Sequence, residues 1–262
     1  MGDFATILYD VADGVATLTM NRPESMNGMT TRMLRETHEA LTAASQDPGV
    51  RVLVLTGAGR SFCPGADLKH STSGARPGPE DEAQAYHYRV PVLLHEMPAV
   101  TIAAVNGPCA GAGMGWACGC DIRVATPNAM FNTAFLNVAV AGDMGLPWSL
   151  PRLVGAAKAR ELSFLSEKFS AEEALRMGLV ARTWEEDVFR DEVAWLAKRL
   201  AAKSPIALRT MKAHYVAAEH MPNMGDFVDL ETSRHLTIVA SEDTREAFRA
   251  FLEKREPKFS GR

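Results

Sequence analysis

The chain has 262 residues, which is enough to bury a large core as one α/β domain or as two smaller domains. With 47% hydrophobic residues, 23% charged residues and a net charge of −4, its composition is that of an ordinary cytoplasmic protein and argues against a general nucleic-acid surface. We expect no membrane contact, because no apolar run reaches the roughly 18 residues of a span and the N-terminus has no basic region of a signal peptide.

The cysteine and histidine patterns predict neither disulfides nor a metal site. The four cysteines include no C-x-x-C pair, so we expect reduced, mostly buried thiols; they are Cys63, Cys109, Cys118 and Cys120. None of the seven histidines stands in an H-E-x-x-H or comparable ligand spacing.

The first half of the chain alternates strand and helix patterns, which predicts right-handed βαβ units. Strand patterns cover residues 7–10, 15–20, 52–56, 100–105 and 122–125, with a short strand or turn at Phe131. Helical patterns cover residues 29–46 and 80–96 and a short small-residue helix after the 100–105 strand. A hairpin turn is predicted at Ala12-Asp13-Gly14.

The second half is predicted to be almost entirely helical from Lys158 onward, with Pro205 and Pro222 near helix starts or breaks. Residues 69–79 combine Ser, Gly, Pro and Arg without periodicity, which predicts a mobile surface loop. The residues alone therefore predict a mixed α/β part followed by an α part.

Two glycine-rich segments each follow a buried strand pattern. They read Gly57-Ala-Gly-Arg-Ser-Phe-Cys-Pro-Gly-Ala-Asp-Leu68 and Val105-Asn-Gly-Pro-Cys-Ala-Gly-Ala-Gly-Met-Gly-Trp-Ala-Cys-Gly-Cys-Asp121. Glycines let the backbone approach a ligand closely, and a helix N-terminus attracts negative charge. A dinucleotide fingerprint is excluded, since its G-x-G-x-x-G spacing needs a glycine at Trp116 or Cys118. Two such sources of backbone N–H groups predict an oxyanion hole.

Together the two segments resemble the crotonase, or enoyl-CoA hydratase/isomerase, family, through its G-A-D loop and its A-V-N-G turn. The resemblance runs from Asn21-Arg-Pro-Glu24 to Phe251-Leu-Glu-Lys-Arg255. It implies an α/β fold in which residues 1–200 form a crotonase-like spiral of ββα turns with the acyl-CoA site, followed by a C-terminal helical trimerisation region at 201–262. It also implies an enzyme that acts on an acyl-CoA thioester as a homotrimer or a dimer of trimers, with no cofactor beyond the CoA of its substrate.

By resemblance, the backbone N–H groups of Ala66 and Ala112 match the two positions that bind the thioester oxygen. Such donors act where negative charge develops, and each contributes ~3–4 kcal/mol to the transition state. We interpret Asp67, which follows Ala66, as structural rather than as a base, because aspartate readily satisfies N–H groups in turns.

The resemblance also indicates contacts with the CoA part of the substrate. Phe251 and Lys254 match positions that, in the family, contact the adenine and ribose phosphate of CoA bound to a neighbouring subunit. Lys69 and Arg22 could meet phosphates, and the 69–79 loop is expected to cover the substrate tail. The alternative for Phe251 and Lys254 is an ordinary amphipathic last helix.

Hydratases of this family carry two glutamates, and this chain has neither. Counting from Cys120 and Asp121 puts Gly115 and Phe135 at their positions, so the usual two-glutamate addition of water cannot operate. One acid remains nearby: Asp143 matches a functional aspartate of the dienoyl-CoA isomerase, ring-epoxide isomerase, dihydroxynaphthoyl-CoA synthase and 4-chlorobenzoyl-CoA dehalogenase branches.

Asp143 has two possible roles. In an apolar cleft beside Phe135, Met144 and Trp148, its carboxylate should have a raised pKa that suits proton transfer beside an enolate. Alternatively, it caps the helix that starts near Met144, because Gly142-Asp143-x-Gly145 is similar to an N-cap pattern. The two roles can coexist.

We therefore expect double-bond isomerisation or an atypical hydration, in which Ala66 and Ala112 stabilise a thioester enolate and Asp143 moves the proton. Two alternatives stay open. A dehalogenase-like activity would fit Asp143 and an aromatic Phe135, but it needs a histidine base, whose position falls at Tyr88, one residue from His87. The other alternative is a non-catalytic acyl-CoA-binding subunit that kept the fold and lost the glutamates.

Overall fold

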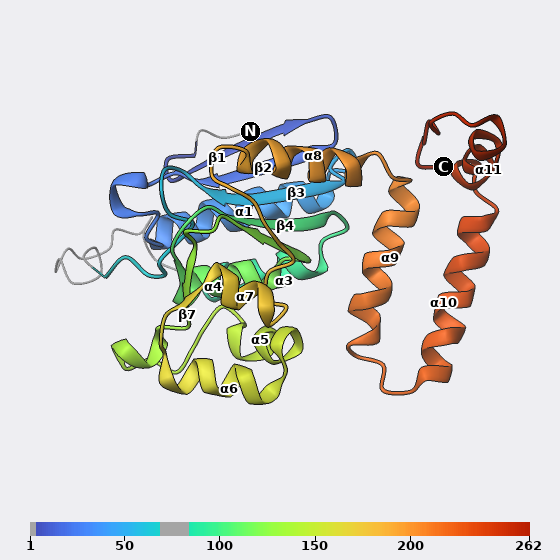
Figure 1. Ribbon diagram of the computed structural model, residues 1–262. Helices are drawn as coiled ribbons and strands as arrows, with labels where there is room; N and C mark the ends of the chain where they lie inside the picture. Colours follow the sequence, from blue (N-terminus) through green and yellow to red (C-terminus); the bar gives the residue numbers. More distant parts are fainter. Residues whose placement is uncertain (1–3, 69–83) are drawn as a thin grey trace.

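The computed structural model describes residues 4–68 and 84–262 (Figure 1). The predicted 69–79 loop, Lys69 within it, and the first residues of the predicted 80–96 helix lie outside the described residues.

Two sheets organise the first two thirds of the chain. The larger has six strands in the order β1-β2-β3-β4-β6-β9, namely Ile7–Ala12, Val15–Met20, Val52–Gly57, Val100–Val105, Ile122–Ala125 and Arg182–Thr183. The smaller has the order β5-β7-β8, namely Cys109–Ala110, Met130–Asn132 and Phe169–Ser170. In the larger sheet β1 and β2 are antiparallel, joined by a turn with Asp13 and Gly14 at positive φ, and the other pairings are parallel.

The helices are, in chain order, α1 (Thr31–Gln46), α3 (Val90–Glu96), α4 (Gly111–Gly119), α5 (Leu146–Val154), α6 (Ala156–Leu165), α7 (Ala171–Arg176), α8 (Phe189–Ala201), α9 (Pro205–Ala218), α10 (Met224–Val239) and α11 (Glu242–Glu253). The described part of the chain also contains three short 3-10 helices, η1 (Pro23–Ser25), η3 (Ala85–Arg89) and η4 (Phe135–Val138). Within the described ranges, no helix is long and apolar enough to cross a membrane.

The central strands β3 and β4 of the larger sheet are buried on both faces, as the continuous apolar patterns predict. Successive side chains of β3 point to opposite faces: Leu53 and Leu55 enter the main core with α1, α3 and α4, while Val52 and Val54 enter a second core under α8. The glycine-rich segments leave this sheet at the carboxyl ends of β3 and β4 and come together there.

Most predicted elements are confirmed, with one addition. The region after Lys158 is almost entirely helical as predicted, but it also contributes β8 and β9, strands of two residues each that extend the two sheets and that the sequence did not predict. Strands this short carry no alternating pattern that a sequence could reveal. Pro205 does start α9, at its first turn, and Pro222 directly precedes Asn223, the N-cap of α10.

The three last helices, α9 to α11, stand to one side of the sheets, with α9 and α10 packed as a pair (Figure 1). One lysine fastens this arm to the core. The ammonium of Lys212, on α9, lies 2.8 Å from the Asp121 carboxylate and donates to the carbonyls of Leu94 (3.0 Å) and Ala99 (2.9 Å). Its side chain is 4% exposed, and this burial lowers the pKa of Lys212.

Replacing Lys212 by methionine should lower the free energy of unfolding by about 3–5 kcal/mol, because Asp121 and two carbonyls lose a buried partner. Urea unfolding followed by circular dichroism measures the change. Lys203→Met, at an exposed lysine just before α9, is the control and should have little effect. Equal losses in both variants would contradict the anchoring role.

Candidate functional site

The backbone around Ala66 is held by a short parallel bridge to Met29. The Met29 N–H donates to the Gly65 carbonyl (2.8 Å), and the Asp67 N–H donates to the Met29 carbonyl (2.9 Å). Because successive N–H groups of an extended chain point to opposite sides, the Ala66 N–H points away from Met29. Ala66 itself is an exposed residue.

The second donor lies at the start of α4. Ala112 is the second residue of this helix, so its N–H has no carbonyl partner within the helix and lies at the positive end of the helix dipole. The two segments touch backbone to backbone: a Cβ atom built on Gly65 would lie 3.5 Å from the Ala112 nitrogen and 3.2 Å from the Ala110 oxygen. Gly65, at φ 100°, has the conformation that glycine permits. The structure thus brings the Ala66 and Ala112 donors to neighbouring stretches of backbone.

Two asparagine amides fix the loop that leads to Ala66. Asn106, directly after β4, donates to the carbonyls of Gly57 (2.9 Å) and Gly59 (3.0 Å) and accepts from the Gly57 N–H (3.2 Å). Its side chain therefore ties the end of β4 to the first glycine-rich segment. Sequence reasoning quoted Asn106 in the A-V-N-G motif without assigning this role.

The second amide belongs to Asn27, which is fully buried and in the left-handed conformation at φ 63°. It donates to the carbonyls of Ala58 (2.9 Å) and Ser61 (2.7 Å) and accepts from the Arg22 N–H (2.9 Å). A buried amide with every contact made rigidifies its surroundings. No local sequence signal identified Asn27.

Asp67 and Arg22 form an ion pair, with Nη2 and Oδ2 2.9 Å apart. Arg22 also donates to the Gly28 carbonyl (2.5 Å). These contacts agree with a structural role for Asp67 and give the Arg22 guanidinium protein partners in place of the phosphate considered from the sequence.

The N-cap interpretation of Asp143 is wrong. Helix α5 begins at Leu146, two residues later than such a cap requires, and its N-cap is Gly145, without any side-chain hydrogen bond. Asp143 lies in the preceding turn, where its backbone carbonyl accepts from the Leu146 N–H (3.1 Å). Among the described residues, no hydrogen bond or ion pair engages its carboxylate. Asp143 is an exposed residue rather than one enclosed in a cleft, and partial desolvation still raises its pKa.

Phe135 connects the two halves of the site. Its Cε1 atom lies 3.9 Å from a Cβ built on Gly111, the first residue of α4, and its Cδ2 atom lies 3.9 Å from a Cβ built on Gly142. The ring therefore spans from the start of α4 to the turn that carries Asp143. Phe135, which stands at the second glutamate position, is thus an apolar residue between the start of α4, where the Ala112 N–H lies, and the turn that carries Asp143.

His87 lies elsewhere. It is buried against α1, with its ring centroid 5.8 Å from that of His38 and 4.3 Å from that of Tyr86, and its Nδ1 accepts from the Gln84 N–H. Burial, and secondarily Arg35, lowers the pKa of His87. Tyr88 is exposed. The described contacts of His87 therefore run to α1 and its own turn, and none joins it to Asp143.

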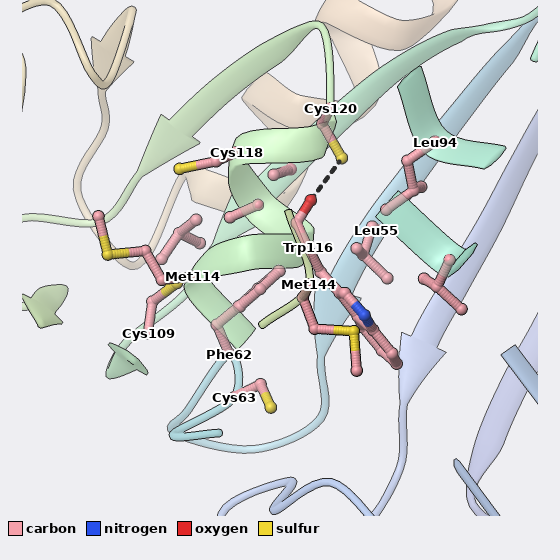
Figure 2. Close-up of a cluster of buried hydrophobic side chains, with 14 of the residues drawn as sticks. Leu55, Phe62, Cys63, Leu94, Cys109, Met114, Trp116, Cys118, Cys120 and Met144 are labelled. Carbon is pink, nitrogen blue, oxygen red and sulfur yellow. Dashed lines mark hydrogen bonds between the residues drawn. The ribbon is translucent and has the colours of Figure 1, made fainter. Parts of the chain in front are cut away.

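The four cysteines are buried and reduced, as predicted. Figure 2 shows them with Trp116, Phe62 and Met144 in the core around α4. Burial raises the pKa of Cys63 and Cys120 to about 12 and that of Cys118 to about 11, so these thiols are poor nucleophiles. Trp116 is buried in the core, whereas Trp148 is partly exposed beneath the Arg152 guanidinium.

The two residues expected to contact CoA from a neighbouring subunit lie on the arm. Phe251 is 81% exposed on α11, and Lys254 ends that helix at φ 52°. In the parts of the chain that are described, no cluster of three or more His, Cys, Asp or Glu side chains is placed to hold a metal ion.

Known proteins share this sequence and architecture over nearly their whole length. The profile of the family described as Enoyl-CoA hydratase/isomerase matches residues 10–262. A 1,2-epoxyphenylacetyl-CoA isomerase of Escherichia coli K12 is 36% identical over 259 residues, which is 98% of each chain. An (E)-benzylidenesuccinyl-CoA hydratase of Thauera aromatica is 35% identical, over 97% of this chain and 99% of that one.

Solved structures agree. The crystal structure of a putative enoyl-CoA hydratase from Streptomyces coelicolor A3(2) superposes with a TM-score of 0.92 at 34% identity, over 100% of this chain and 96% of that one. An enoyl-CoA hydratase of Bacillus anthracis superposes with a TM-score of 0.91. The fold is thus the crotonase fold, and the chain belongs to the enoyl-CoA hydratase/isomerase family.

Proposed function

We propose that this enzyme moves a proton within an acyl-CoA thioester, with the Ala66 and Ala112 N–H groups as the oxyanion hole and Asp143 as the acid/base. One observation carries the proposal. A carboxylate without a protein partner and with a raised pKa lies across the Phe135 ring from the N-terminus of α4. Glycine and phenylalanine, at positions 115 and 135, supply no second carboxylate.

The chemistry follows from these groups. The thioester oxygen accepts hydrogen bonds from the two N–H groups. Removal of a proton from the carbon next to the carbonyl, or from the saturated carbon beyond a conjugated double bond, then leaves an enolate whose charge rests on that oxygen. The Asp143 carboxylate takes the proton and returns it to another carbon of the same conjugated system, which moves the double bond. Desolvation strengthens Asp143 as a base by raising its pKa towards the working pH.

Isomerisation is favoured over hydration because it needs one proton-transferring group, whereas hydration needs a water molecule to be activated as well. The similarity to a 1,2-epoxyphenylacetyl-CoA isomerase supports this preference, while the similarity to a benzylidenesuccinyl-CoA hydratase keeps an atypical hydration possible. The placement of His87 against α1 gives no support to a dehalogenase-like reaction.

We also propose that the arm mediates assembly into a homotrimer or a dimer of trimers. Its helices expose large apolar side chains that have no covering in the single chain, namely Met211, Tyr215, Met224, Leu236, Phe248, Phe251 and Leu252. In such an assembly Phe251 and Lys254 would reach the CoA of a neighbouring subunit, and Lys69 the CoA of its own, with no further cofactor.

Asp143→Asn should abolish proton exchange, because the amide keeps the size of the side chain but cannot accept the proton. Mass spectrometry of 2-enoyl, 3-enoyl and dienoyl-CoA esters in deuterated water, with ultraviolet monitoring of conjugation, measures exchange and double-bond migration. We expect a loss of at least ~100-fold, the lower range for general acid–base catalysis.

The control is binding of the same esters, which the substitution should leave nearly unchanged because the oxyanion donors are main-chain groups. Fast hydration or isomerisation that persists in Asp143→Asn would refute the role of Asp143. Binding by the parent protein without any exchange would instead establish the non-catalytic acyl-CoA-binding alternative.

The same substitution should stabilise the fold at neutral pH. A raised carboxyl pKa means that the folded chain holds this proton more tightly than the unfolded chain, so its stabilising contribution is complete below the ordinary pKa of about 3.9 and is lost as the pH rises through the raised pKa. Urea unfolding should therefore find Asp143→Asn more stable than the parent at neutral pH, with the difference vanishing in acid. A variant that is less stable at neutral pH would show that the carboxylate stabilises the turn.

A further inference from the structure

Helix α4 has a gap in its surface at Gly115, and the turn that carries Asp143 occupies it. A Cβ atom built on Gly115 would lie 2.6 Å from the Cβ of Met144 and 2.9 Å from the Met144 carbonyl oxygen. These atoms belong to the backbone or are bonded directly to it, so no side-chain rotation can move them away. The two segments therefore meet at a distance that only glycine allows.

The turn itself adopts an unusual conformation. Gly142, Met144 and Gly145 all have positive φ, at 113°, 48° and 67°, on both sides of Asp143. A positive φ is costly for Met144, as for any residue with a side chain, and it persists only where the surroundings impose it. Here the surroundings are α4 and the core: Met144 is 4% exposed, and Figure 2 shows its side chain beside Trp116.

We infer that Gly115 is a positioning residue for proton transfer: its missing side chain seats Met144 against α4 and thereby sets where the Asp143 carboxylate stands relative to the Ala112 N–H. The inference rests on the proposed role of Asp143. Ala112 and Gly115 are in the same helix, three residues apart, so the helix fixes the distance between the Ala112 N–H and the contact with Met144. Asp143 is bonded directly to Met144, so this contact also fixes the position of the Asp143 carboxylate.

The contact also explains why a carboxylate on α4 is incompatible with this turn. Any residue larger than glycine at position 115 needs the space that Met144 fills. A glutamate there would therefore displace Asp143 rather than act beside it. In this chain the carboxylate that we propose to act comes from the turn before α5, where Met144 fills the space beside Gly115.

The test adds one methyl group at position 115. Gly115→Ala should push the turn outwards and lower the rate of exchange on the order of 100-fold, since a displacement of about 1 Å costs that much. KM should change little, because the oxyanion donors do not move. The pH midpoint of the rate should shift, because the surroundings of Asp143 change. Gly225→Ala, a helical glycine in the first turn of α10, is the matched control and should leave rate and pH profile unchanged.

A second variant removes the nearer of the two colliding atoms, the Met144 Cβ, and leaves the Met144 carbonyl oxygen in place. Met144→Gly deletes the Met144 Cβ and suits the positive φ, so Gly115→Ala with Met144→Gly should exchange faster than Gly115→Ala alone, although the lost core side chain lowers the melting temperature. This rescue separates positioning from stability, because a merely structural Gly115 would show the lowest rate in the least stable protein.

The outcomes are distinct. Gly115→Ala with the full parental rate, in a protein whose Asp143→Asn variant is inactive, overturns the positioning role and leaves the proposed function intact. A loss of rate without rescue, in step with the melting temperature, also overturns it. Full activity of Asp143→Asn refutes the proposed function itself, independently of Gly115.

Discussion

The site depends on the close approach of main chain to main chain around α4. All nine residues of this helix are buried. Because its glycines have no side chains, other segments pack directly against the helix backbone. Gly113 meets the backbone of Cys63, Gly115 meets Met144 and Gly119 meets Pro91. The helix therefore has almost no amphipathic pattern, and its position follows from contact on every side. Because the first oxyanion segment and the Asp143 turn both rest directly on it, the same rigid element sets the relative positions of donors and carboxylate.

Polar groups then make this close packing specific. The amides of Asn27 and Asn106 satisfy carbonyls in a loop that has no regular secondary structure, and the pair of Arg22 with Asp67 holds the end of that loop. Each of these side chains has protein partners, whereas the Asp143 carboxylate has none among the described residues. This contrast supports the proposed role of Asp143, because an unpaired carboxylate is held in place at a cost to stability.

The sequence predicted the parallel strands, the glycine turns and the family, because each leaves a local pattern, and it placed the two glycine-rich segments directly after β3 and β4, where the structure has them. It did not predict β8 and β9, which consist of two residues each and exist only through their partners. It misjudged Asp143 as a possible cap, because the true N-cap, Gly145, depends on backbone conformation rather than on a hydrogen-bonding side chain. The role of Asn27 and the fit of Gly115 against Met144 are tertiary, since the contacts join residues about thirty positions apart.

Among the four thiols around α4, that of Cys63 can report how often this arrangement opens. Cys63 lies within the first glycine-rich segment, fully buried against Gly113, and burial raises its pKa to about 12, so a thiol reagent can reach it only when that segment moves away from Gly113. In the limit where closing is faster than modification, the labelling rate of such a cysteine reports the free energy of local opening, as hydrogen exchange does for amides. The protein therefore carries, next to its proposed catalytic donors, a residue whose reactivity measures what fraction of the time the site is open.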